Sequence, residues 1–213
     1  VKGVINAIGH NAGINKFLFQ GPAGTGKTET AKHVARILER SLYSVNLINL
    51  VDSKLGETPK NITRLFEEIN HLQNPEKVVV LFDEVDAIAL DRTNDHDVRE
   101  MGRATTTFLR QLDNLSDQIV LIATTNLFNK FDKALSRRFD AVIDFGRYSQ
   151  EDLADISIAV LNSYLDRFPF AGKNARLFRK IIQQSNHLPY PAELSNEIKT
   201  AIAFSDPNHP LDY

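Results

Sequence analysis

The 213-residue chain lacks cysteine and tryptophan, and it has little that would suit a metal centre. The absence of cysteine fits a reducing compartment, for which the cytoplasm is the expected location. Six histidines are scattered along the sequence without an i, i+4 pair, so no zinc-type site is indicated.

Long hydrophobic runs and a strong charge of one sign are also missing. The longest apolar run has about five residues, far fewer than the ~20 that a membrane-spanning helix needs. The net charge of -2 gives no general attraction to nucleic acid. No secretory signal is expected. Because the chain begins at Val1 rather than at a methionine, we expect it to be a segment of a longer protein.

One glycine-rich segment carries a complete G-x-x-x-x-G-K-[ST] pattern, which is typical of a phosphate-binding loop. A short apolar strand is predicted at 16–20 before it, and a helix with one apolar face after it. Backbone N–H groups at the start of such a helix attract phosphates, Lys27 is expected to reach the β- and γ-phosphates, and the Thr28 hydroxyl is expected to bind Mg²⁺. The residues expected to bind the nucleotide here are Gly21, Pro22, Ala23, Gly24, Thr25, Gly26, Lys27, Thr28 and Glu29.

A second motif follows the apolar run 78–82, where the chain reads Asp83-Glu84. Ligands of open α/β sheets bind at the carboxyl ends of the strands, so both carboxylates are placed for catalysis. We expect Asp83 to hold Mg²⁺ and Glu84 to orient and polarise the attacking water. A solvated acidic strand end is the plainer interpretation, but the accompanying phosphate loop favours nucleotide hydrolysis.

The order of elements predicts an α/β fold, a three-layer sandwich around a five-stranded parallel sheet, followed by a small all-helical lid domain. The expected domains are 1–147 and 148–213. A helix is expected to begin with Thr58 as its N-cap and Pro59 as its first residue. Ser149 and Asp152 indicate a capping box at the first lid helix. The expected strands are 16–20, 45–50, 77–82, 119–123 and 141–145, and a polar loop is expected at 91–97.

On these motifs the chain resembles the ATPase domain of the AAA family, within the AAA+ superfamily of ring-forming motors. Residues 83–89 follow the family's acidic motif, and 122–126 resemble its strand that ends in a polar sensor. The resemblance implies that Asn126 faces the γ-phosphate and the attacking water. It also implies ATP and Mg²⁺ as cofactors, self-association into a ring with a hexamer as the expected form, and a protein client.

Residues 132–140 resemble the family segment that carries arginine fingers, which reach into the site of a neighbouring subunit. Arg138 matches the family register better, with Arg137 beside it. Many relatives carry a second arginine where this chain has Ala141, so the finger set is expected to be reduced or supplemented by Arg137. The alternative is that both arginines lie on a solvated helix end, where positive charge is favourable.

The lid follows the AAA pattern, whereas the pore segment departs from it. Ala192 stands where other AAA+ branches place an arginine, as in the AAA branch itself, and Ile156 matches a position that packs near the base, although a core role fits it equally well. Residues 53–58 resemble the central pore loop, but Lys54 replaces the aromatic that grips an extended polypeptide. Weak unfolding of generic protein substrates is therefore expected.

The sequence predicts a Mg²⁺-dependent ATPase that performs conformational work on a protein or protein complex. A motor or loader acting on nucleic acid is the first alternative, and it would require a basic stripe or an extra helical insertion. A non-hydrolysing assembly switch is the second alternative, and Glu84 together with Asn126 argues against it.

Overall fold

The computed structural model describes residues 1–10, 13–51, 56–89, 95–127, 133–166, 174–185 and 188–204. The chain divides into two compact units, each of which is considered by itself. The first comprises Val1–Pro22 and Lys27–Phe145, and the second comprises Ala23–Gly26 and Gly146–Tyr213. Among the described residues, no helix combines the length and the apolar character that crossing a membrane requires.

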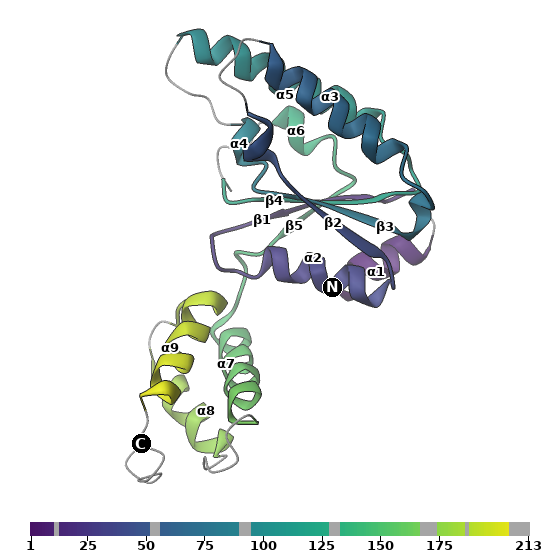
Figure 1. The fold of residues 1–213 in the computed structure, drawn as a ribbon. Coiled ribbons are helices and arrows are strands. Elements are labelled where there is room, and N and C mark those ends of the chain that lie inside the picture. Colours follow the sequence, from purple (N-terminus) through teal and green to yellow (C-terminus); the bar gives the residue numbers. More distant parts are fainter. Residues whose placement is uncertain are drawn as a thin grey trace. The chain divides into compact units, whose positions relative to one another are not determined.

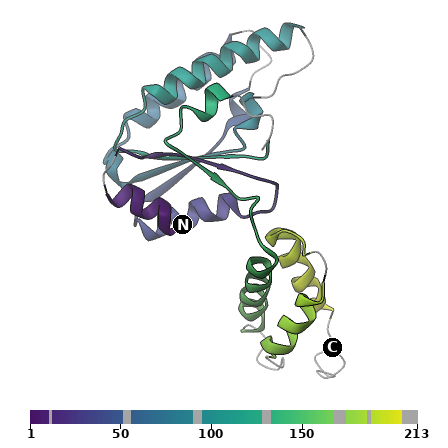
Figure 2. The same ribbon diagram turned by 180° about the vertical axis from the view of Figure 1, so that it is seen from behind.

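The first unit is a three-layer α/β sandwich (Figures 1 and 2). Within the described residues its sheet has five parallel strands in the order β2-β3-β4-β1-β5. This architecture confirms the predicted fold class. The strands are β1 (Lys16–Gln20), β2 (Ser41–Asn46), β3 (Val78–Asp83), β4 (Val120–Thr125) and β5 (Ala141–Asp144).

Helices cover both faces of this sheet. On one face lie α1 (Lys2–Gly9) and α2 (Lys27–Ile37); on the other lie α3 (Glu57–Asn70), α4 (Asp86–Ala89), α5 (Asp95–Asp113) and α6 (Lys133–Ser136). The three central strands are apolar and buried on both sides, as expected for parallel strands between helical layers.

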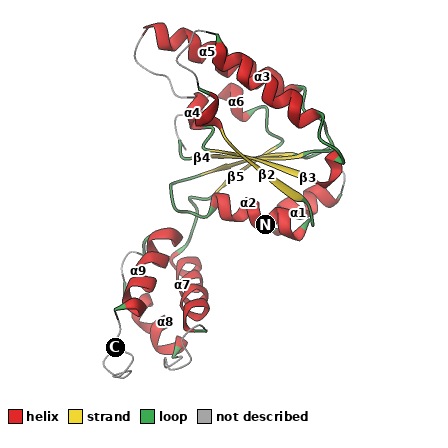
Figure 3. Cartoon of the chain, in the orientation of Figure 1, coloured by secondary structure: helices red, strands yellow, loops and turns green. Residues whose placement is uncertain are grey.

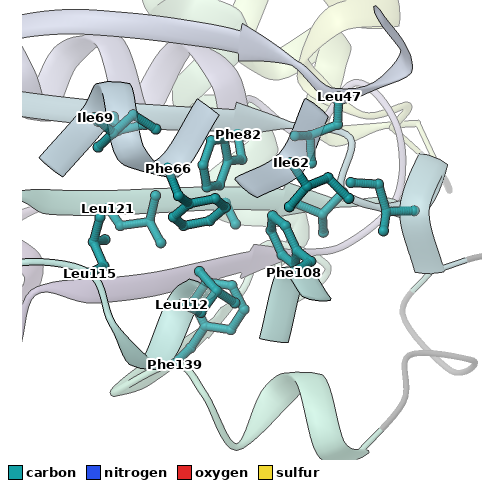
Figure 4. Packing of buried hydrophobic residues seen from close by; sticks show 14 of the residues in the cluster. Leu47, Ile62, Phe66, Ile69, Phe82, Phe108, Leu112, Leu115, Leu121 and Phe139 are labelled. Atoms are coloured by element: carbon teal, nitrogen blue, oxygen red, sulfur yellow. The ribbon is translucent and has the colours of Figure 1, made fainter. Parts of the chain in front are cut away.

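Three phenylalanines form the centre of the larger core, between α3, α5 and the sheet (Figure 4). Phe66 and Phe82 have ring centroids 5.4 Å apart, and each ring lies 5.6 Å from that of Phe108. Tilted and edge-on pairs at this separation are favourable beyond the burial of their area. This packing fixes β3 under α3 and α5, and so fixes the place at which Asp83 leaves the sheet.

Three details of the predicted elements are wrong. The second strand runs over β2 rather than 45–50, because the Asn46 side chain accepts from the Ile48 N–H and turns the chain into the 3₁₀ helix Leu47–Leu50. β2 is an edge strand with mostly exposed side chains, so its apolar signal is weak. Helix α3 begins at Glu57 after Gly56, whose φ of 81° suits glycine, and Thr58 is therefore inside its first turn. Helix α5 begins at Asp95, inside the expected loop, whose residues 91–94 lie outside the described ones.

The second unit contains α7 (Gln150–Leu165), α8 (Ala175–Gln183) and α9 (Pro191–Ala203), as the secondary-structure colouring shows (Figure 3). The predicted capping box of α7 is present, with Ser149 and Asp152 bonded reciprocally. These bonds lower the pKa of Asp152. Leu153, Ile182 and Leu188 form part of its small core.

Candidate functional site

Apart from the two arginines, the predicted site residues of the first unit meet at the carboxyl edge of the sheet. The phosphate loop follows β1, Asp83 is the last residue of β3, and Asn126 follows β4. β4 pairs with both β1 and β3, so the three strand ends are adjacent. Because all strands are parallel, residues from distant parts of the sequence share this edge.

Lys27 is the centre of this arrangement. It is the first residue of α2 and only 7% exposed, yet its ammonium group is well supplied with acceptors. Its Nζ donates to the backbone oxygens of Gly21 at 2.8 Å and Pro22 at 2.7 Å, and to Asn126 Oδ1 at 2.8 Å. The lysine is therefore held between the start of the loop and the end of β4.

The electrostatic surroundings of Lys27 are divided. Burial lowers the pKa of its ammonium group, while Asp86, Asp83 and Glu84 raise it in opposition, with Asp86 contributing most of the three. Lys27 is thus a buried cation beside several carboxylates. Such a site favours an anionic ligand that carries a bound cation over an anion or a cation alone.

Thr28 and Asp83 provide adjacent oxygen atoms. The Thr28 hydroxyl lies 2.9 Å from Asp83 Oδ1 and 3.2 Å from Oδ2, and Asp83 is half-buried. A hydroxyl and a carboxylate are ligands suited to Mg²⁺, which keeps waters and substrate phosphates as its other ligands. The described residues contain no group of three or more His, Cys, Asp or Glu placed for a metal ion, so a protein-only metal cage does not describe this site.

Glu84 follows Asp83 with an exposed side chain and an unusual backbone. Its φ is 55°, in the left-handed region that non-glycine residues enter at a cost. Its N–H donates to Thr124 Oγ1 at 2.9 Å, and that hydroxyl donates to Asp83 Oδ1 at 2.6 Å. Thr124 therefore fixes the positions of both acidic residues. The resemblance of residues 122–126 to the family's strand did not predict this role.

Asp86 is a further residue that the sequence reasoning left without a role. It is buried and accepts hydrogen bonds from the Thr125 hydroxyl and from the Asn126 N–H, the latter at 2.8 Å. The signal that could have found it is a charged residue among apolar ones, in Val85-Asp86-Ala87, directly after the acidic pair.

The tip of the phosphate loop, Ala23–Gly26, belongs to the second unit. Gly24 O accepts from the Ala192 N–H at 3.0 Å, and Thr25 O accepts from the Tyr148 hydroxyl at 2.8 Å. Gly24 has a φ of 76°, and a Cβ there would lie 3.0 Å from the Ala192 Cβ. Glycine is thus required both by backbone conformation and by close packing.

Ala192 also lies beside an open groove of about 780 Å³ in the second unit, which is lined in part by Gly24, Tyr190, Glu193 and Asn196. Ile156 is half-buried on α7, and its contact with a base stays a prediction. In the expected pore segment, 52–55 lie outside the described residues, and with them Lys54.

The two arginines lie away from the phosphate loop. Both are exposed, and Arg138 Nε pairs with Asp113 Oδ1 at 2.9 Å, at the end of α5. Asp140, two residues later, accepts from the N–H groups of Asn15 and Lys16 at the start of β1. This is the amino edge of the sheet, about one strand length, roughly 17 Å, from the carboxyl edge.

Comparison with known proteins identifies a family and several relatives with similar sequences. The family whose model matches residues 17–147, more than half of the chain, is described as the ATPase family associated with various cellular activities (AAA). The AAA family ATPase y4kL of Sinorhizobium fredii is 40% identical over 133 residues, which is 62% of this chain and 39% of that protein.

Two eukaryotic relatives match over a similar stretch. The peroxisomal ATPase PEX6 of Candida glabrata is 36% identical over 135 residues, or 61% of this chain and 13% of the relative. The vacuolar protein sorting-associated protein 4 of Dictyostelium discoideum is 36% identical over 132 residues, or 61% of this chain and 29% of the relative. The chain thus spans well under half the length of these curated relatives.

Proposed function

The chain belongs to the AAA family of ATPases, and from this premise we propose that it binds ATP with Mg²⁺ at the carboxyl edge of its sheet and hydrolyses the β–γ phosphoanhydride. The observation that carries the proposal is the position of Lys27 between the loop oxygens and Asn126, with Thr28 and Asp83 in mutual contact beside it. An ammonium group, amide donors and a cation site are what a triphosphate requires.

Each residue has a proposed task. Lys27 binds the β- and γ-phosphates when they replace its present oxygen partners, and Gly24 and Gly26 let the backbone approach the phosphates. Thr28 and Asp83 hold Mg²⁺, which when bound neutralises charge on the phosphate oxygens. Nothing in their positions conflicts with this donor set, since the hydroxyl and carboxylate already lie within hydrogen-bonding distance.

The catalytic step is assigned to Glu84 and Asn126. Glu84 orients a water and polarises it for attack on the γ-phosphorus, and its exposed carboxylate beside Asp83 supports that task. Asn126 contacts the γ-phosphate and the same water, supported by its present hydrogen bond to Lys27. Gly21, Pro22, Ala23, Thr25, Glu29 and Ile156 complete the proposed nucleotide-binding residues.

At the level of the assembly, we propose that the chain works in a ring, expected to be a hexamer, with Arg138 or Arg137 acting on a neighbour's nucleotide. The position of Arg138 at the amino edge supports action in trans, because the length of a strand keeps it too far from its own phosphate loop to reach it. The proposed client is a protein or protein complex. One relative is named for its association with protein sorting, which supports this class of client.

The experiment that tests the binding proposal compares two lysines on one helix. Lys27→Ala removes the positive charge nearest to the phosphates and is expected to abolish ATP binding in an equilibrium titration with a fluorescent ATP analogue. The matched control is Lys32→Ala on the same helix, where an exposed lysine pairs with Glu29. Equal affinity of the Lys27→Ala variant and the wild type would contradict the phosphate-loop assignment.

A further inference from the structure

Asp86 is a buried carboxylate, and both of its oxygens accept hydrogen bonds from one short segment at the end of β4. It is one of the few buried charged residues in the described part of the chain, with 9% of the residue exposed. Oδ1 accepts from the Thr125 hydroxyl, and Oδ2 accepts from the Asn126 N–H at 2.8 Å. A buried carboxylate is costly unless hydrogen-bonded, so these bonds hold α4 and the end of β4 together.

The turn that follows β4 is held by the Thr125 hydroxyl as well as by Asp86. Thr125 Oγ1, while donating to Asp86, accepts from the Leu127 N–H at 3.1 Å. The backbone on either side of Asn126 is therefore tied to one hydroxyl and one carboxylate. Thr125 is fully buried, so water does not compete for these bonds.

Asn126 passes this constraint to the phosphate loop. Its backbone is held by Asp86, while its side-chain Oδ1 accepts from Lys27 Nζ at 2.8 Å. Asp86 does not touch Lys27 through a hydrogen bond, but its charge opposes the effect of burial on the pKa of that lysine. The chain of contacts thus runs from Asp86 through Asn126 to Lys27.

We propose that Asp86 is a positioning residue that aims the Asn126 side chain at the γ-phosphate and thereby sets the preference of the site for ATP over ADP. This inference rests on the proposed function, because it requires a nucleotide at Lys27. ATP and ADP share the phosphates bound by the loop and differ in the γ-phosphate. A residue that acts through Asn126 therefore affects ATP binding more than ADP binding.

A purely structural role for Asp86 has different consequences. If the carboxylate only closes the turn and stabilises the fold, its removal lowers the melting temperature and weakens both nucleotides alike. The ratio of the two affinities separates the alternatives, and so does the dependence of the effect on the Asn126 side chain.

The test measures equilibrium affinities for ADP and for a non-hydrolysable ATP analogue in the complete protein. Asp86→Ala removes both acceptors and is expected to lower the ratio of ATP-analogue to ADP affinity about tenfold, since misplacing a contacting group by about 1 Å can cost up to ~10²-fold. Asp86→Asn should restore most of the ratio, because its amide can accept from the Asn126 N–H and donate to Thr125. Asp117→Ala is the matched control, an exposed acid near the opposite end of the same strand.

The decisive measurement uses the double variant Asp86→Ala, Asn126→Ala. The Asn126→Ala change keeps the backbone N–H and removes the side chain that is proposed to face the nucleotide. In the Asn126→Ala background the Asp86→Ala change should have no further effect on the ratio. Effects that multiply, equal losses for ATP analogue and ADP, or a ratio like that of Asp117→Ala would each overturn the inference.

A second variant keeps the test informative if Asp86→Ala does not fold. Thr125→Val removes one of the two donors at almost unchanged volume and is expected to lower the affinity ratio, whereas Thr125→Ser should retain it. An unchanged ratio in Thr125→Val would count against the inference. Failure of the proposed function gives a distinct result, because the wild type would then bind neither nucleotide.

Discussion

The two edges of the central sheet use their polar residues differently. At the amino edge, polar side chains pair with each other or with strand backbone: Arg138 with Asp113, and Asp140 with the N–H groups of Asn15 and Lys16. At the carboxyl edge, polar side chains form a hydrogen-bonded network around one cation, Lys27. Its other members are Thr28, Asp83, Asp86, Thr124, Thr125 and Asn126.

The comparison separates hydrogen bonds that stabilise the fold from hydrogen bonds that a ligand can replace. A carboxylate that accepts backbone N–H groups, as Asp140 does, completes the sheet and leaves nothing for a substrate. A buried lysine that donates hydrogen bonds to three protein oxygens can exchange these oxygens for phosphate oxygens of higher charge. Substitutions at the two edges should therefore fail in different assays.

Outside the phosphate loop, the largest effect is expected for Arg138, whose proposed role joins the two edges across a subunit boundary. Arg138→Ala should lower the ATPase rate of the assembled protein by ~10³-fold, because a guanidinium group stabilises charge on the transferred phosphoryl group. Steady-state phosphate release is the measurement, with Arg110→Ala, an exposed arginine in the last turn of α5, as the control.

Mixing experiments tell whether Arg138 acts in trans. Chains carrying Arg138→Ala, mixed with chains carrying Lys27→Ala, should recover part of the lost activity. Where the two kinds of chain are neighbours, one supplies an intact Lys27 and the other an intact Arg138, so a complete site forms between them. A demonstrably mixed ring that stays inactive would count against the arginine finger and would leave Arg138 as a partner of Asp113 alone.

The next effect belongs to Glu84 at the carboxyl edge. Glu84→Gln should cut turnover by at least ~10²-fold and leave ATP binding intact, because the amide cannot polarise the attacking water as a carboxylate does. Single-turnover hydrolysis separates this loss from binding. Glu76→Gln, an exposed acid just before the amino end of β3, should have no such effect. A Glu84→Gln variant that hydrolyses ATP at the wild-type rate would remove Glu84 from the mechanism.

The smallest effect on activity is expected at the amino edge itself. Asp140→Ala removes the acceptor of two backbone N–H groups and should lower the free energy of unfolding by about 1–3 kcal/mol. ATP affinity of the folded fraction should remain unchanged. Urea denaturation and a nucleotide titration on the same preparation provide both values, and a loss of affinity without a loss of stability would contradict the distinction between the edges.

Much of the fold follows from local patterns, which is why the sequence predicts it. The buried strands β1, β3 and β4 are continuous apolar runs, and the loop after β1 is defined by its glycines. The edge strand β2 was misplaced because its exposed side chains carry little apolar signal. Gly56 as an N-cap was missed because serine and threonine are the commoner signals.

The contacts within the candidate site were harder to predict, because their partners are distant in sequence. Thr124 is 41 residues from Asp83, and Thr125 is 39 residues from Asp86. A single sequence gives the residue types of both segments but not the register that pairs them. The hydrogen bond from Tyr148 to Thr25, across 123 residues, belongs to the same class, as does the ion pair that holds Arg138.

The most direct test of the account is phosphate release from ATP by the complete protein, with and without Mg²⁺. We expect release that requires Mg²⁺, is lost in Lys27→Ala and persists in Lys32→Ala, because only the first lysine faces the phosphate loop oxygens and Asn126. Release that continues at the same rate after chelation of Mg²⁺, or that survives in Lys27→Ala, would contradict the proposal that the carboxyl edge of this sheet is the ATPase site.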